Sequence, residues 1–114
     1  MSQPFSSAEA AWFWTTAALD RKTVSGPLPP APCRPEEVLR CLDSLYRARH
    51  IVLLHAYVLR HYGRRGRPPS ATHPRERCDH ILWTEAMNGL APKLRKAGIV
   101  ADPFAGVGWP PQEA

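Results

Sequence analysis

The side chains best suited to chemistry in this chain are arginines, and they gather in its middle. Between residues 34 and 77 there are ten arginines and no lysine, against four acidic residues, which gives this stretch a charge of about +6. The guanidinium group stays charged at physiological pH, and its planar fork matches phosphate and carboxylate groups. This imbalance indicates a nucleic acid or an acidic protein surface as the partner.

The densest basic segment is "RRGRPP" at residues 64–69. Its core, "RGRP" at 65–68, resembles an AT-hook, a short motif that lies in the minor groove of A·T-rich DNA. In such a motif the glycine lets the backbone sit deep in the groove, the proline keeps the chain extended, and the arginines enter where negative potential is concentrated. The alternative is a basic loop that joins two helices. The resemblance implies that the DNA-contacting residues are Arg64, Arg65, Gly66, Arg67 and Pro68.

Two further arginines, Arg47 and Arg49, lie between two apolar segments with helical spacing. Two short helices meeting there would fit a helix-turn-helix, but the turn of that motif usually contains glycine and this one has none. The segment "IVLLHAYVL" at 51–59 is also too apolar for a helix that lies in a DNA groove. We therefore expect Arg47 and Arg49 to form one basic surface with the loop at 64–67.

Residues that could support catalysis or bind a metal are present but are not spaced for either task. No two of the three cysteines, Cys33, Cys41 and Cys78, have the spacing of a CxxC motif. Cys78 and His80 are two positions apart, so on a helix they would point about 160° away from each other. No glycine-rich phosphate loop follows a strand, because no segment has the alternation of a strand. We expect no enzymatic activity, no metal or cofactor, and no small-molecule substrate.

Helical periodicity along the chain predicts a small all-α domain over residues 1–100, a bundle of four or five helices with proline-rich loops. The capping box Ser6-x-x-Glu9 predicts where the first helix begins, Pro35 suits the first position of the second, and Gly63 is placed to end the third. Pro92 should kink the last helix or separate a final turn. The expected helices span about 7–21, 35–47, 50–62 and 75–97, and a flexible tail is expected over 101–114.

The apolar residues predict a core and a second kind of surface. The segment 51–59 is apolar almost all round and should lie at the centre of the core. In the last helix the stripe Ile81, Trp83, Met87, Leu90 and Leu94 should face it. Four tryptophans in 114 residues could also anchor an interface, because exposed aromatic residues often do so. The docking face expected on this alternative consists of Trp12, Trp14, Trp83 and Met87.

These features lead to one main hypothesis on function and one alternative. The N-terminus has no basic region typical of a signal peptide, and no run approaches the roughly 18 apolar residues of a membrane span. An odd cysteine count without a pairing pattern favours a reducing compartment, so we expect a soluble cytoplasmic protein. The main hypothesis is a small DNA-binding regulator, either transcriptional or nucleoid-associated. The alternative is a protein-interaction module, or a homodimer, that docks through its aromatic face.

Overall fold

The computed structural model describes residues 3–20 and 31–102. These residues form α1 (Ala8–Leu19), α2 (Pro35–Arg47), α3 (Leu53–Arg65) and α4 (Arg77–Lys96). Within the described ranges there is no strand, only an isolated parallel bridge between Phe5 and Val100. The predicted all-α class is confirmed, as are two separate helices on either side of the basic segment at 47–50.

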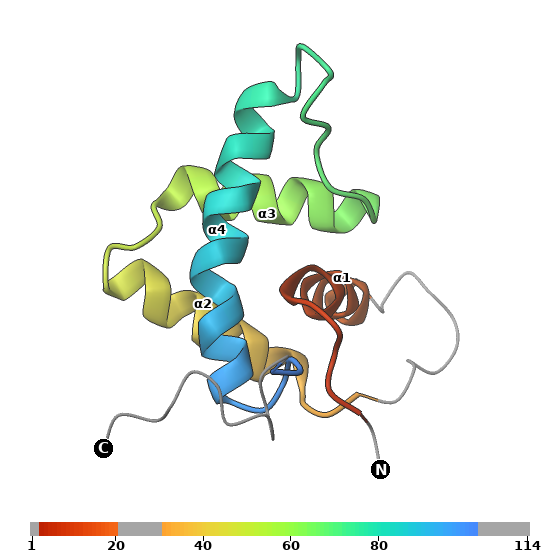
Figure 1. Cartoon of the computed structure of the whole chain (residues 1–114), viewed down its shortest axis with the longest axis vertical. Helices are drawn as coiled ribbons and strands as arrows, with labels where there is room; N and C mark the ends of the chain where they lie inside the picture. The colour runs from red at the N-terminus through yellow and green to blue at the C-terminus, as the bar shows by residue number, and fades with distance from the viewer. Residues whose placement is uncertain (1–2, 21–30, 103–114) are drawn as a thin grey trace.

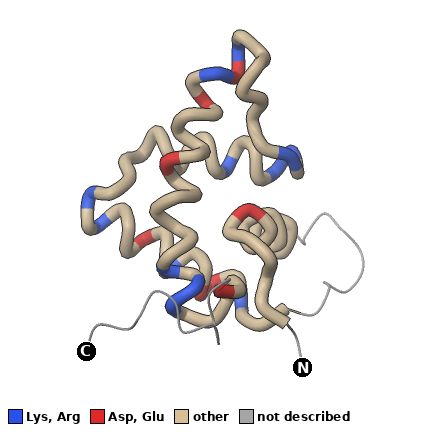
Figure 2. The backbone as a smooth tube through the Cα atoms, in the orientation of Figure 1, with Lys and Arg blue, Asp and Glu red and all other residues tan. Residues whose placement is uncertain are grey.

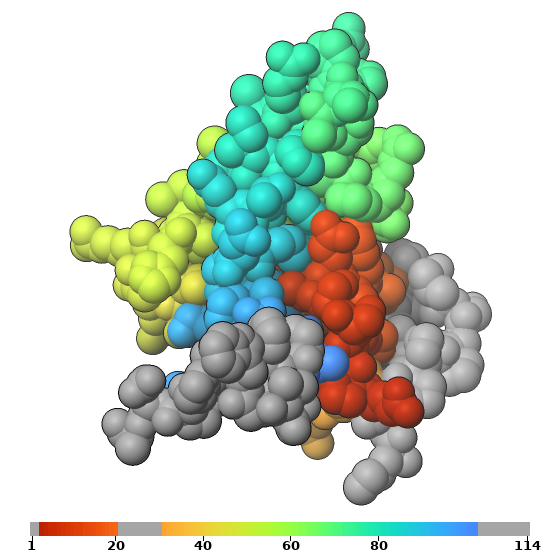
Figure 3. Space-filling model, viewed as in Figure 1, coloured from red at the N-terminus to blue at the C-terminus, as the bar shows by residue number. Residues whose placement is uncertain are grey.

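Helices α1 and α4 each pack against both α2 and α3, whereas the consecutive helices α2 and α3 touch each other only slightly. Figure 1 shows α4 crossing in front of α2 and α3, with α1 seen end-on beside it. In the space-filling view, α4 occupies the middle of the molecule, between α1 on one side and the connection from α2 to α3 on the other (Figure 3). This connection lies at the edge of the molecule, where it is open to solvent.

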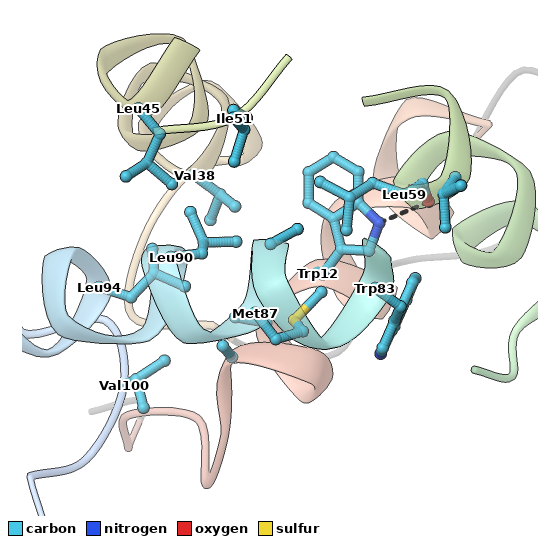
Figure 4. Packing of buried hydrophobic residues seen from close by; sticks show 14 of the residues in the cluster. Trp12, Val38, Leu45, Ile51, Leu59, Trp83, Met87, Leu90, Leu94 and Val100 are labelled. Atoms are coloured by element: carbon cyan, nitrogen blue, oxygen red, sulfur yellow. Dashed lines mark hydrogen bonds between the residues drawn. The ribbon is translucent and has the colours of Figure 1, made fainter. Parts of the chain in front are cut away.

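The core is built around α4, whose buried residues Trp83, Met87, Leu90 and Leu94 repeat at helical spacing. Figure 4 shows these side chains meeting apolar residues from the other three helices. This part of the predicted stripe is confirmed. The prediction is wrong for the first residue of the stripe, because the Ile81 side chain is 53% exposed. Two positions before Trp83, a side chain points to nearly the opposite side of the helix.

The predicted helix beginnings are partly confirmed. Pro35 is the first residue of α2, where its missing N–H leaves no hydrogen bond unmade. In α1 the capping residue is Ser7 and not Ser6, since the Ser7 side chain accepts a backbone hydrogen bond in the first turn at 3.1 Å. The predicted partner of the capping box, Glu9, instead accepts a hydrogen bond from the Trp83 indole N–H at 2.7 Å. That contact ties α1 to the core helix.

The end of α4 is a glycine-based helix stop. Gly98 has a φ of 78°, and the following N–H, of Ile99, donates to the Leu94 carbonyl at 2.9 Å. The Ile99 side chain is buried, as expected for the apolar contact of such a stop. α4 is not split at Pro92, which lies inside the continuous helix. The predicted flexible tail falls mainly outside the described residues, but Ala101 is held by a hydrogen bond to the N-terminal segment.

None of the described helices is long and apolar enough to cross a membrane.

Candidate nucleic-acid interface

Helix α3 is fixed by a close approach to α1 at Gly63. The sequence predicted Gly63 as the end of this helix, but α3 continues to Arg65 and stops at Gly66, whose φ is 77°. A Cβ atom on Gly63 would lie 2.6 Å from Thr16 Cγ2 and 2.7 Å from Trp12 Nε1, well inside contact distance. The glycine is therefore required by helix packing and not by a turn.

Two hydrogen bonds cross the same contact. The Trp12 indole N–H donates to the Leu59 carbonyl at 2.8 Å, drawn as a dashed line in Figure 4, and the Thr16 hydroxyl donates to the Gly63 carbonyl at 3.0 Å. Both bonds are buried, where a lost partner would be costly. They fix the rotation of α3 about its axis and hence decide which residues point outward.

Helix α4 holds α3 from another side. The Tyr62 hydroxyl donates to Asp79 Oδ2 at 2.7 Å, and His55 Nε2 lies 2.9 Å from Glu85 Oε1. His55 Nδ1 accepts from the Val52 N–H at 3.0 Å, which leaves the proton on Nε2 to be donated to Glu85. Burial, followed by the hydrogen bond to Asp79, raises the pKa of Tyr62 to about 12. Tyr62 therefore stays a neutral donor over the physiological range.

The second half of α3 presents a basic outward face. Arg60 and Arg64 are one turn apart and so lie on the same side of the helix, and both are exposed. Tyr57 and His61 lie beside them with nearly parallel rings, 4° apart in orientation and 6.3 Å between centroids. Arg60 was not among the predicted contacts, because the predicted helix ended at residue 62; only the continuation of α3 to Arg65 places Arg60 and Arg64 one turn apart on the same helix. We call Tyr57, Arg60, His61 and Arg64 the basic face.

The arginines of the predicted motif have different surroundings. Arg64 Nε lies 3.6 Å from Asp20 Oδ2. The Arg65 guanidinium lies 5.1 Å from the centre of the Tyr62 ring and 3.9 Å from Glu76 Oε2. Arg67 is exposed, and among the described residues no carboxylate lies within 4 Å of it. The Arg64 side chain is 58% exposed against 32% for Arg65, so Arg64 and Arg67 are better placed than Arg65 to reach a ligand.

The segment at 64–69 does not have the extended form of a hook. Its first two arginines belong to α3, and the chain turns at Gly66 in the left-handed region. Pro69 is buried, and the Ser70 N–H donates to Glu76 Oε1 at 2.8 Å. This hydrogen bond, aided by Arg65, lowers the pKa of Glu76. The local geometry is that of a basic loop closing a helix, which was the alternative to the hook.

Arg47 and Arg49 do not join the other arginines. They lie where α2 ends, before the N-terminus of α3, whereas the 64–67 segment lies at its C-terminus (Figure 2). Thirteen residues of α3 separate the two groups by about 20 Å at 1.5 Å per residue. The single basic surface expected from the sequence is therefore wrong in its layout, because the helix between the two groups holds them apart.

The predicted aromatic docking face is also wrong. Trp12, Trp83 and Met87 are 4%, 2% and 8% exposed, and they form part of the core. Trp14 is half-buried against Phe5, with 5.5 Å between ring centroids. These side chains pack within the domain and are not exposed for docking to a partner.

Four of the exposed large apolar residues lie in the segment that was expected to be central to the core. Ile51, Val58 and Leu59 are buried there, as predicted. The side chains of the same segment that face solvent are Val52 at 53%, Leu53 at 70%, Leu54 at 57% and Tyr57 at 68% exposure. Because α3 is covered on only two sides, a helix that is apolar almost all round leaves an apolar strip uncovered.

The part of the chain that the structure describes contains no cluster of three or more residues that could hold a metal ion. Its three cysteines are free thiols, and burial raises the pKa of both Cys33 and Cys41, which disfavours the reactive thiolate. Comparison of the chain with protein-family models, with curated proteins and with solved structures gives no match.

Proposed function

We propose that this protein binds duplex DNA through the basic face of α3, with Arg67 as an additional contact. The observation that carries the proposal is the placement of Arg60 and Arg64 on successive turns of one exposed helix face. The Cβ atoms of such a pair are about 6 Å apart, so both guanidinium groups can reach the same phosphate strand. Phosphate neutralisation by arginine is the main source of affinity in DNA binding of this kind.

The proposed contact is rigid. Gly63 and Tyr62, on the inward side of the same turns, are held against α1 and α4 by buried or partly buried hydrogen bonds. The helix backbone then needs little further ordering, and the ordering cost of binding is mainly that of the exposed arginine side chains. Arg47 and Arg49 lie about 20 Å from the C-terminal end of α3, which carries Arg64 and Arg67, and would meet a separate stretch of backbone, because that distance exceeds the width of a major groove, about 12 Å.

The chemistry of the face favours binding with little sequence preference. It offers guanidinium groups and a stacked Tyr57–His61 pair, but no asparagine or glutamine to read an adenine edge. Contacts to phosphates position a protein without reading sequence. Of the two roles considered for a DNA-binding chain, these properties fit a nucleoid-associated protein better than a sequence-specific regulator.

Titration of a labelled duplex by fluorescence anisotropy at several salt concentrations tests the proposal. Affinity should fall steeply between roughly 50 and 200 mM salt. The double variant Arg60→Ala/Arg64→Ala should lower the salt slope by about two and weaken binding more than tenfold at low salt. A matched control, Arg95→Ala/Lys96→Ala, removes the same charge from the exposed end of α4 and should change binding little. No binding at low salt, or equal losses in both variants, would refute the proposal.

The same assay separates the basic face from a hook. Duplexes rich in A·T and in G·C should bind with similar affinity, because the chain turns at Gly66 and Arg65 is held by Tyr62 and Glu76. A clear preference for A·T-rich duplex that disappears in Arg65→Ala/Arg67→Ala would show that the loop opens on DNA into the extended hook.

A further inference from the structure

An exposed group of apolar side chains surrounds the junction between α2 and α3. We call this group, Tyr46, Val52, Leu53 and Leu54, the apolar corner; its members are 45% to 70% exposed. Together with Ile51, Arg47 and Arg49 they line one shallow hollow. In Figures 1 and 3 this junction lies at the left edge of the molecule, away from α1. Large apolar side chains gathered in one exposed place are typical of an interaction site.

The corner has a basic rim held in a costly conformation. Arg49 has a φ of 63°, in the left-handed region that favours glycine. The Arg49 N–H donates to the Tyr46 carbonyl, and the His50 N–H donates to the Leu45 carbonyl. This is a helix C-terminal motif in which Arg49 occupies the position that is usually glycine. Among the described residues no carboxylate lies within 4 Å of Arg49. The positive charge at the rim is therefore open to a partner.

The helix that begins at the corner adds a second positive feature. The residue before α3 is Val52, which has no side-chain oxygen to cap the helix, and the first turn contains no acidic residue. Within the described part of the chain, the N–H groups of Leu53 and Leu54 have no acceptor. Free N–H groups and the helix dipole favour a negative charge at this point. A carboxylate placed beside the apolar corner would meet both this helix end and Arg49.

We propose that the apolar corner docks an acidic amphipathic segment of another protein. Large apolar side chains of that segment cover Leu53 and Leu54, and its carboxylates face Arg49 and the N-terminus of α3. This site contains none of the arginines of the basic face proposed for DNA, although Tyr57 of that face lies one turn from Leu53. A second copy of the chain is a poor occupant, because a two-fold interface would bring Arg49 close to Arg49 of the other copy, whereas Arg47 is paired with Asp43 at 2.9 Å.

Selection from a library of displayed random peptides tests the proposal, since it requires no partner to be chosen in advance. The full chain serves as bait, and the variant Leu53→Ser/Leu54→Ser is used for counter-selection. Both leucines are more than half exposed, so the variant should keep its helical circular dichroism and its melting temperature. The retained peptides should combine aspartate or glutamate with large apolar residues spaced three or four apart. Retention of only basic peptides, or of none that depends on the two leucines, would overturn the proposal.

One selected peptide then provides the quantitative test. Leu53→Ser/Leu54→Ser should weaken its binding at least about tenfold, the effect expected at the centre of an interface. Arg49→Ala should weaken it less and make binding less dependent on salt. The control Leu19→Ser removes a leucine of similar exposure from the end of α1 and should leave binding unchanged. An equal loss in this control would overturn the site.

Two other possible occupants of the apolar corner would give different experimental results. Leucine-dependent binding to anionic lipid vesicles, with no peptide retained, would replace the proposed partner by a membrane surface. A dimer that is seen by sedimentation and lost in the leucine variant would replace it by a second copy of the chain. Neither result would affect the DNA assay, whose variants, Arg60 and Arg64, lie in the second half of α3.

Discussion

The two faces of α3 obey different constraints. On the inward face, Gly63 allows α1 to approach, and Leu59 and Tyr62 make buried or partly buried hydrogen bonds to neighbouring helices. On the outward face, Leu53 and Arg60 are exposed to solvent. Inward residues are thus explained by the fold alone. Large apolar and charged residues on the outward face have no such explanation, so function is best sought there.

The largest effect that separates the two faces is expected from Gly63→Ala. The added Cβ would overlap Thr16 and Trp12, and both of these side chains are themselves packed and hydrogen-bonded. Overpacking of this kind costs about 1–3 kcal/mol, and we expect the upper part of that range because two buried hydrogen bonds are strained as well. Urea denaturation measures the free energy of unfolding.

A matched control exists in α4. Gly89 is also inside a helix, but a Cβ there would meet only the Leu45 methyl groups at 3.6 Å, an ordinary contact. Gly89→Ala should therefore stabilise the protein by up to about 1 kcal/mol, the helix propensity gained. If both glycine variants lose stability equally, the contact between α1 and α3 is not the reason for Gly63.

A smaller effect is expected from Tyr62→Phe, which removes the hydrogen bond to Asp79. The loss should be about 1–2 kcal/mol at neutral pH, because one hydrogen bond is lost and the partly buried carboxylate is left without its donor. The pH dependence gives a specific signature. Folding raises the pKa of Tyr62 from 10 to about 12. The neutral phenol therefore stabilises the fold fully below pH 10, and this contribution is lost as the pH rises towards 12.

Urea titrations from neutral pH to about pH 11 measure this dependence, since the unfolded tyrosine titrates near 10. The difference in stability between the wild type and Tyr62→Phe should shrink as the pH rises. A constant difference would mean that Tyr62 is not a buried donor and that α4 does not fix the inward face in this way.

The core that packs against the inward face of α3 was largely predictable from the sequence, whereas the role of Gly63 was not. The stripe from Trp83 to Leu94 follows from periodicity, and Pro35 marks the beginning of α2 by local chemistry. Gly63 was misread because a glycine near a predicted helix end has two explanations, a cap or a close helix contact. Only the position of α1, which is 47 residues away in sequence from its partners in α3, decides between them.

The outward face was not predictable, because exposure depends on how many helices cover α3. The pattern at 51–59 indicates a helix but not which side remains open, so Leu53 and Leu54 were assigned to the core. Conversely, Trp12 and Trp83 are typical interface residues in composition, but here they are needed to fill a small core. The layout of the arginines depended on the length and direction of α3, which spacing alone does not give.

The smallest expected effect compares two helix ends. α2 and α4 end with the same pair of hydrogen bonds, and the left-handed position is occupied by Arg49 in one and by Gly98 in the other. Arg49→Gly should raise the free energy of unfolding by about 0.5–1 kcal/mol, since glycine adopts this conformation without a steric penalty. Gly98→Ala should lower it by a similar amount. Thermal melts of the two variants and the wild type measure both changes.

The same substitution connects stability to the proposed docking site. If Arg49 is kept at the corner for its charge, Arg49→Gly should melt higher and yet bind a selected acidic peptide more weakly, whereas Gly98→Ala should melt lower and bind it normally. Opposite signs in stability and binding would mark Arg49 as a residue retained for an interaction at a cost in stability. If Arg49→Gly gains stability and keeps full affinity for the peptide, the arginine has no part in docking. Binding at the apolar corner would then depend on its leucines alone.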